Sequence, residues 1–145
     1  MSQPAHVDPR GLRVVAGITA VVLALVLITP RPLSVALLAV QVAVFAISAL
    51  VSLQASPYAV LFAKVVRPRI GPPAELEDAR PPRFAQVVGL GFTAAALIAF
   101  LAGATTVGYV ATAFALVAAL LNASVGLCLG CEFYLALRRF TPARA

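Results

Sequence analysis

The stretch "LSVALLAVQVAVFAISALVSL", residues Leu33 to Leu53, carries no charged side chain and decides the class of the fold. An apolar run of about 18 or more residues with almost no charge is typical of a helix that crosses a bilayer. Three further runs have the same character, so we expect four transmembrane helices. We place them at residues 12–29, 33–53, 84–103 and 106–137.

The composition of the whole chain agrees with this reading. Of the 145 residues, 62% are hydrophobic and only 11% are charged, which leaves too few polar side chains to cover a soluble globule. We therefore expect a single all-α integral membrane domain over residues 1–145, with its four helices arranged as two hairpins.

The first apolar run, Arg13 to Thr29, has basic residues before it and could be a signal peptide. However, the sequence that follows, "TPRPLS", lacks the small-x-small pattern at which such peptides are cleaved. A retained first helix is the favoured interpretation.

The basic residues predict the orientation of the chain in the membrane. They fall before the first helix, in the central segment and after the fourth helix, and Arg31 is the one exception. Because Lys and Arg concentrate in cytoplasmic loops, we expect a multi-pass protein of the cell membrane with both termini in the cytoplasm. The positive charge then suits anionic lipid headgroups, and no interleaved aromatic and basic surface points to nucleic acid.

The central segment, residues 54–83, is predicted to lie on the cytoplasmic side. Ser56 and Pro57 begin a short stretch, "PYAVLFAKVV", whose spacing suits a helix in the headgroup layer. The stretch "RPRIGPPAELEDARPPR" then predicts an extended loop of about seventeen residues.

A faint internal repeat links the two halves of the chain. "VDPRGLRV" (Val7 to Val14) echoes "EDARPPRF" (Glu77 to Phe84), and "PYAVLFAKVVRP" more weakly echoes "CEFYLALRRFTP". Such matches predict two parallel repeats, although chance produces matches of this length too. Where the second half has Cys128 and Cys131, the first has Gln54 and Pro57, so the fold at this corner does not require cysteines.

The two cysteines are the strongest candidates for chemistry. Spaced by three residues on a helix, Cys128 and Cys131 share one face near the cytoplasmic edge of the membrane, where the cytosol is expected to keep them reduced. Gly126 and Gly130 beside them permit either close helix packing or a break. A break before Cys128 would aim the N-terminus of the following helix at its sulfur.

Three interpretations of the cysteine pair stay open. It could be a redox-active or sulfur-carrying dithiol, a seam of small residues that packs against another helix, or half of a metal site completed by a homodimer. We favour the dithiol and expect no metal or other cofactor.

Three polar residues accompany the pair. Asn122 and Gln41 lie inside apolar helices, where they could line a binding path or simply form an interhelical hydrogen bond. Glu132 adjoins Cys131 and could accept a proton during thiol exchange, although pairing with an interfacial arginine is the favoured interpretation. With five acidic residues and one histidine, no hydrolytic or phosphoryl-transfer site can be assembled.

Three stretches, "VDPRG", "RPRIGPPAELEDARPPRFAQ" and "NASVGLCLGCEFYLALRR", together resemble the bacterial, mainly actinobacterial, membrane proteins grouped as domain of unknown function family 4395. The resemblance covers nearly the whole chain. It implies a four-helix membrane protein without an established activity, whose gene often neighbours genes of thioredoxin-like and thiosulfate sulfurtransferase proteins. The family pattern points to the charged segment Arg67 to Arg83 and to six residues near the C-terminus: Asn122, Gly126, Cys128, Gly130, Cys131 and Tyr134.

The sequence therefore predicts a cytosol-facing dithiol that exchanges disulfides or carries sulfur with a thioredoxin-like or sulfurtransferase partner. We expect that partner to dock on the basic residues of the central segment: Arg67, Arg69, Arg80 and Arg83. The alternatives are a transporter or transporter subunit for a sulfur-containing solute, and a membrane scaffold without chemistry. A bundle this small also predicts a homodimer or a partner protein.

Overall fold

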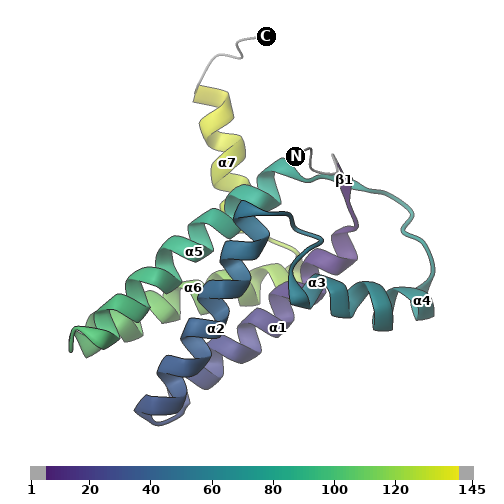
Figure 1. Ribbon diagram of the computed structural model, residues 1–145. Coiled ribbons are helices and arrows are strands. Elements are labelled where there is room, and N and C mark those ends of the chain that lie inside the picture. The colour runs from purple at the N-terminus through teal and green to yellow at the C-terminus, as the bar shows by residue number, and fades with distance from the viewer. Residues whose placement is uncertain (1–5, 141–145) are drawn as a thin grey trace.

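The computed structural model describes residues 6–140 and is helical over most of that range (Figure 1). Its elements in chain order are β1 (His6–Val7), α1 (Pro9–Ile28), α2 (Arg31–Leu50), α3 (Pro57–Leu61), the π-helical turn η1 (Phe62–Val66), α4 (Arg67–Ile70), β2 (Glu77–Asp78), α5 (Arg80–Leu101), α6 (Thr105–Val125) and α7 (Leu129–Phe140).

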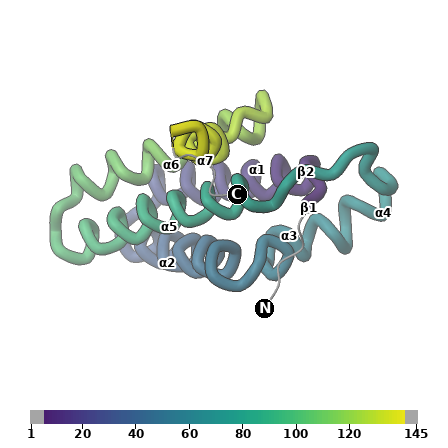
Figure 2. The backbone as a smooth tube through the Cα atoms, turned by 90° about the horizontal axis from the view of Figure 1, so that it is seen from above, coloured from purple at the N-terminus to yellow at the C-terminus, as the bar shows by residue number. Residues whose placement is uncertain are grey.

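Helices α1, α2, α5 and α6 form a four-helix bundle (Figure 2). In the ring they make, α1 packs against α2 and α6, and α5 packs against the same two helices. All four are long and apolar enough to cross a membrane, which agrees with a multi-pass membrane protein. The bundle core consists of Leu23, Val26, Leu38, Ala96 and Phe100.

Local sequence explains where the helices begin. Asp8 caps α1, since its carboxylate accepts a hydrogen bond of 2.9 Å from the backbone N–H of Arg10. Proline occupies the first turn of α1, α2, α3, α4 and α5, where its missing N–H costs no helical hydrogen bond.

The two ends of the bundle differ. Short turns at residues 29–30 and 102–104 close one end, whereas β1, β2, α3, α4 and α7 gather at the other (Figure 1). We call this second end the basic end, because α1 and α5 begin there with arginines and α4 and α7 add more. Arg31 lies at the opposite end, where it donates to the Thr105 hydroxyl at 3.0 Å.

Several contacts at the basic end join the first half of the chain to the second. β1 pairs with β2 in antiparallel fashion, with Val7 opposite Glu77. Arg13, in α1, donates to the Ser124 carbonyl at the end of α6 at 2.8 Å. Arg83, in α5, donates to the Ala49 carbonyl near the end of α2 at 2.7 Å.

The prediction of a single fourth helix over residues 106–137 is wrong, because α6 ends at Val125 and α7 begins at Leu129. Gly126 has a φ of 75°, the left-handed conformation that glycine adopts at low cost. The N–H groups of Gly126 and Leu127 donate back to the carbonyls of Asn122 and Leu121 at 3.1 and 3.2 Å. These bonds close α6 and turn the chain toward α7.

The predicted seventeen-residue loop is also shorter than expected. The chain stays helical through Ile70 and becomes helical again at Arg80. Pro81 and Pro82, which favoured a loop in the sequence, lie in the first turn of α5 instead.

Candidate functional site

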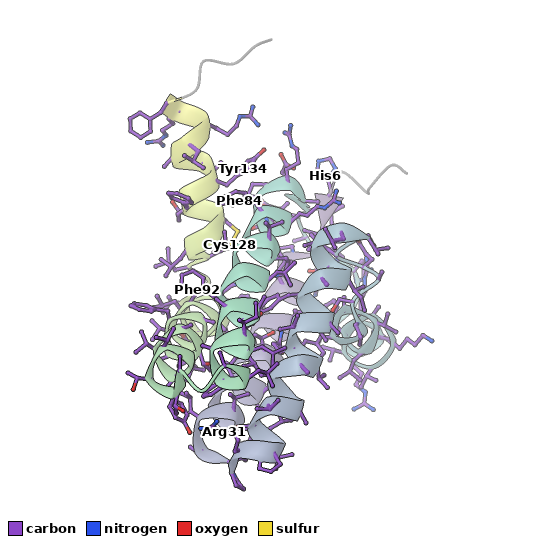
Figure 3. All side chains as sticks on the ribbon, turned by 60° about the vertical axis from the view of Figure 1, so that its left-hand side comes forward. His6, Arg31, Phe84, Phe92, Cys128 and Tyr134 are labelled. Atoms are coloured by element: carbon purple, nitrogen blue, oxygen red, sulfur yellow. A yellow bond between two sulfur atoms is a disulfide. The ribbon has the colours of Figure 1, made fainter. Side chains whose placement is uncertain are left out.

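Cys128 and Cys131 are joined by a disulfide at the basic end of the bundle (Figure 3). Their Cα atoms are 5.1 Å apart, within the range that a disulfide can bridge. The structure thus holds the pair oxidised, whereas the sequence led us to expect two thiols.

The disulfide lies at the N-terminus of α7. The backbone N–H of Cys131 donates to the Cys128 sulfur at 3.1 Å, and the N–H of Glu132 donates to the Cys128 carbonyl at 3.0 Å. Cys128 therefore takes the capping position of the helix. Because a helix N-terminus carries partial positive charge, this position favours a thiolate on Cys128 once the disulfide is reduced.

Close packing fixes α7 against α5. A Cβ added to Gly130 would lie 2.6 Å from both Cα and Cβ of Ala85, so only glycine permits this approach. One turn further along, the ring of Phe84 lies 6.0 Å from that of Phe133 and 5.5 Å from that of Tyr134. The disulfide is held between the start of α5 and the end of α6.

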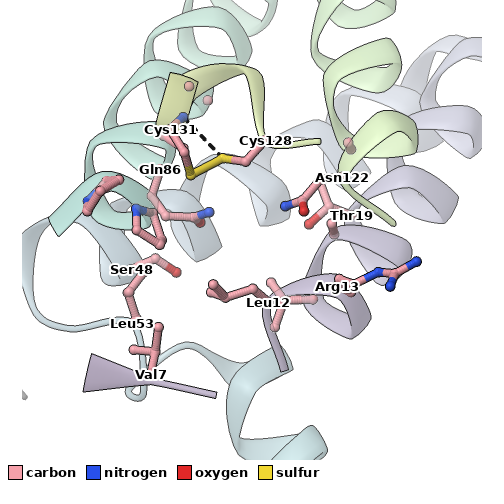
Figure 4. Close-up of a pocket in the computed structure, with 18 of the residues that line it drawn as sticks. Val7, Leu12, Arg13, Thr19, Ser48, Leu53, Gln86, Asn122, Cys128 and Cys131 are labelled. Carbon is pink, nitrogen blue, oxygen red and sulfur yellow. Dashed lines mark hydrogen bonds between the residues drawn. A yellow bond between two sulfur atoms is a disulfide. The ribbon is translucent and has the colours of Figure 1, made fainter. Parts of the chain in front are cut away.

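A cavity of about 1080 Å³ lies beneath the disulfide and extends between the long helices. Both cysteines line it, and the side chains of Asn122, Gln86 and Ser48 point into it (Figure 4). Thr19 lines it too. Apart from polar and charged residues at the basic end, the rest of the lining is largely apolar.

The sequence of α6 helps to explain the cavity. Ala115, Ala118, Ala119 and Asn122 recur at the spacing of one helix face, and all four line the cavity. Three methyl groups on this face leave a space that larger side chains would fill. The same face brings the Asn122 amide to the disulfide end of the cavity.

Gln41 does not join this site. Its side chain is fully buried, and its Oε1 accepts a hydrogen bond of 2.9 Å from the Tyr58 hydroxyl. The suggested link between Gln41 and Asn122 is therefore wrong. Tyr58 instead anchors α3 to α2, and burial raises the pKa of its hydroxyl.

Glu132 is exposed on α7 and lines the cavity. Among the residues 6–140 it forms no ion pair, so the favoured pairing with an arginine is wrong. Arg138, the nearest candidate along the helix, donates to the Tyr134 hydroxyl at 3.1 Å. Glu132 is thus placed beside Cys131 without a cationic partner in the part of the chain that the structure describes.

The four arginines of the central segment differ in their contacts. Arg80 pairs with Asp78 at 2.7 Å, and its hydrogen bonds lower the pKa of the Asp78 carboxyl to about 2. Arg83 is bonded to the Ala49 carbonyl. Arg67 and Arg69 are exposed on α4, and Arg67 also lines the cavity.

Among the polar residues of the cavity that sequence reasoning did not place in the site are Gln86, Thr19 and Ser48. Gln86 carried the same signal as Asn122, an amide inside an apolar helix. Thr19 and Ser48 carried none, because hydroxyl side chains in membrane helices commonly bond their own backbone. Over residues 6–140 no three metal-ligating side chains (His, Cys, Asp or Glu) come together.

No curated protein and no solved structure matches the chain. The family model described as "Domain of unknown function (DUF4395)" matches residues 7–139. That range contains the four long helices, the disulfide and the cavity. The chain therefore belongs to the DUF4395 family.

Proposed function

We propose that Cys128 and Cys131 form a redox-active pair that exchanges disulfides with a thioredoxin-like protein. The observation that carries the proposal is the hydrogen bond from the Cys131 N–H to the Cys128 sulfur at the start of α7. A sulfur in this position is a good leaving group and a good nucleophile, since the helix N-terminus stabilises its anion.

The exchange proceeds in two steps. A thiolate of the partner attacks the Cys128 sulfur, the disulfide breaks, and Cys131 leaves as a thiolate that takes up a proton. The second partner thiolate then attacks the partner's own sulfur in the mixed disulfide and releases Cys128. Two electrons pass from the partner dithiol to the pair, and Glu132 beside Cys131 takes or gives the proton.

A sulfur-carrying role uses the same residue. The Cys128 thiolate would accept sulfane sulfur from the persulfide of a sulfurtransferase, whose own cysteine leaves as a thiolate. The exposed Arg67 and Arg69 on α4 suit a partner with an acidic face in either case. The participation of a partner protein and the existence of a homodimer stay predictions.

The arginines at the basic end support a cytoplasmic location for the disulfide. Disulfides of cytosolic proteins are usually transient and catalytic, so this location favours exchange over a purely structural bond. The cell membrane, the cytoplasmic termini and an actinobacterial source stay predictions.

We also propose that the two halves of the chain are parallel repeats, each a helical hairpin. The register of the small sheet supports this, since Val7 pairs with Glu77, its counterpart in the repeat. Arg13 and Arg83, also counterparts, bond the carbonyls of Ala123 and Ala49 in the opposite halves. Such reciprocal contacts are what a two-fold axis along the bundle would produce.

Trapping of mixed disulfides in intact cells tests the exchange. With Cys131→Ser, Cys128 cannot be released by its neighbour, so we expect covalent adducts with thioredoxin-like proteins that vanish on reduction. Cys128→Ser and the double variant are the matched controls and should trap little. Absence of adducts from every variant, together with unchanged redox and sulfur phenotypes in the double variant, would count against the proposal and favour a scaffold.

The cavity favours a second candidate, transport of a sulfur-containing solute past the disulfide. Asn122 and the cysteines would line the path, whereas Gln41 lies outside the cavity. Uptake of labelled cysteine by vesicles that contain the purified protein separates the two functions. A relay moves no solute, and uptake that depends on Asn122 would support transport.

A further inference from the structure

We infer that the cavity binds a membrane quinone and that the quinone exchanges two electrons with the Cys128–Cys131 pair. The inference rests on the proposed function and names its second substrate. A pair that oxidises one dithiol after another must pass the electrons on. The cysteine pair lies beside a cavity between the membrane-crossing helices. A lipid-soluble carrier is therefore the electron acceptor that fits this position.

The polarity of the cavity suits a neutral ligand. The charged residues that line it belong to the basic end: Asp8, Arg13, Arg67, Glu77, Asp78 and Glu132. Between the long helices the lining consists of apolar groups, amides and hydroxyls. Arg13 points away from the centre of the cavity (Figure 4). A sulfur oxyanion would need a cation at that depth, whereas a quinone needs only hydrogen-bond donors.

Such donors line the cavity together with the two cysteines. The amides of Asn122 on α6 and Gln86 on α5 point into the cavity from two sides below the disulfide (Figure 4). Within residues 6–140 neither side-chain amide forms a hydrogen bond with another residue. Each can therefore donate to a quinone carbonyl oxygen, which places the ring against the disulfide.

The cavity also offers a route for an isoprenoid tail. Phe92 of α5 and Phe114 of α6 both line it, yet they are 40% and 63% exposed on the outer surface of the bundle. Their ring centroids are 6.3 Å apart. In a membrane these exposed rings would face lipid, so they mark a side entrance between α5 and α6. The volume of about 1080 Å³ is at the upper end of ordinary ligand sites and holds a substituted ring with part of its tail.

The reaction balances without another reactant. The two thiols of the reduced pair lose two protons and two electrons as the Cys128–Cys131 bond forms, and the quinone gains both to become a quinol. The pair is then oxidised again and can accept electrons from the next partner dithiol. Cytosolic dithiols would thus be oxidised by the quinones of the membrane.

The reaction can be measured with the full chain in nanodiscs. The pair is reduced, the reductant is removed, and decylubiquinone is added; this fully substituted quinone cannot add to thiols. We expect one quinol for each disulfide formed, counted by ultraviolet absorbance and by thiol alkylation. Asn122→Ala and Gln86→Ala should each lower kcat/KM about tenfold, the effect of one lost hydrogen bond. Ser124→Ala, on the exposed side of α6, is the matched control and should change nothing.

A photoreactive azidoquinone provides a readout that does not depend on a well-folded variant. In the unmodified protein it should label peptides around residues 86–92 and 114–122, in competition with decylubiquinone. Labelling elsewhere overturns the inference, as does quinol formation that survives Cys128→Ser. If the pair exchanges with reduced thioredoxin but never with the quinone, the quinone site alone is wrong. If it exchanges with neither, the proposed function fails as well.

Discussion

The chain leaves the bundle twice at the basic end, after α2 and after α6, and the two exits differ in chemistry. After α2, Leu53 and Ser56 are buried and α3 is tied to α2 by the bond between Tyr58 and Gln41. After α6, Gly126 turns the chain and α7 begins with a disulfide. Since the first exit is built without cysteines, we expect that the second does not need them for folding. The comparison favours a chemical role for the pair.

Replacement of either cysteine should have the largest effect. Cys128→Ser and Cys131→Ser are expected to abolish disulfide exchange, with a loss of more than about a hundredfold, because a dithiol with one sulfur cannot complete the reaction. The free energy of unfolding should fall by about 2 kcal/mol or less, since the disulfide closes a very short loop. Exchange with reduced thioredoxin and thermal unfolding in nanodiscs measure the two effects. A protein that unfolds on loss of the disulfide would make the second exit structural after all.

The packing of α7 should be the next most sensitive feature. Gly130→Ala places a methyl group against Ala85 and should lower the free energy of unfolding by about 2 kcal/mol, a typical cost of overpacking. Gly91→Ala in α5 is the matched control, because a Cβ there meets nothing within 4 Å; it should be neutral or slightly stabilising. Equal effects of the two substitutions would contradict the close contact between α7 and α5.

The two arginine contacts should differ in strength. Arg83→Ala removes a part-buried hydrogen bond of 2.7 Å to the Ala49 carbonyl and should cost about 1.5 kcal/mol. Arg13→Ala removes exposed bonds to α6 and should cost less than about 1 kcal/mol, since water competes there. Chemical unfolding of both variants checks the order. A reversed order would show that the second exit depends more on its arginine than the first.

Replacement of the two aspartates before α1 and α5, Asp8 and Asp78, should give the smallest difference in the free energy of unfolding. The side chain of Asp8 is 7% exposed and that of Asp78 is 43% exposed. Asp8→Ala should therefore cost about 1 kcal/mol as a lost helix cap, and Asp78→Ala less. Thermal unfolding of the two variants at neutral pH measures this difference, and a larger loss for Asp78→Ala would contradict it.

The same aspartates predict a dependence on pH. The hydrogen bonds from Arg80 lower the pKa of Asp78 from its ordinary 3.8 to about 2. The contribution of Asp78 to the free energy of unfolding is therefore complete above about pH 4 and is lost as the pH falls through about 2. The pKa of Asp8 is lowered too, chiefly by the hydrogen bond from Arg10. Unfolding between neutral pH and pH 2 should thus depend less on pH in each alanine variant than in the unmodified chain.

Much of the fold could be predicted from local sequence, because apolar length alone marks a membrane helix. The start of α1 carried a cap and a proline signal in Asp8 and Pro9, whereas the prolines at the start of α5 favoured a loop instead. The break after Val125 could not be placed with certainty, since glycine permits both a continuous helix and a left-handed turn. At the site, the spacing of Cys128 and Cys131 indicated their proximity. The cavity depends on how the small face of α6 meets α1 and α5, which no local pattern reveals, so its lining could not be assembled from the sequence.

The most direct test of the central claim is redox equilibration with a thioredoxin of known reduction potential. The full chain in nanodiscs is mixed with reduced or oxidised thioredoxin, quenched with acid and alkylated, and the thiols are counted by mass spectrometry. A redox-active pair should gain two thiols and lose them again, reversibly and without denaturant. A disulfide that stays intact until the protein is unfolded would contradict the account.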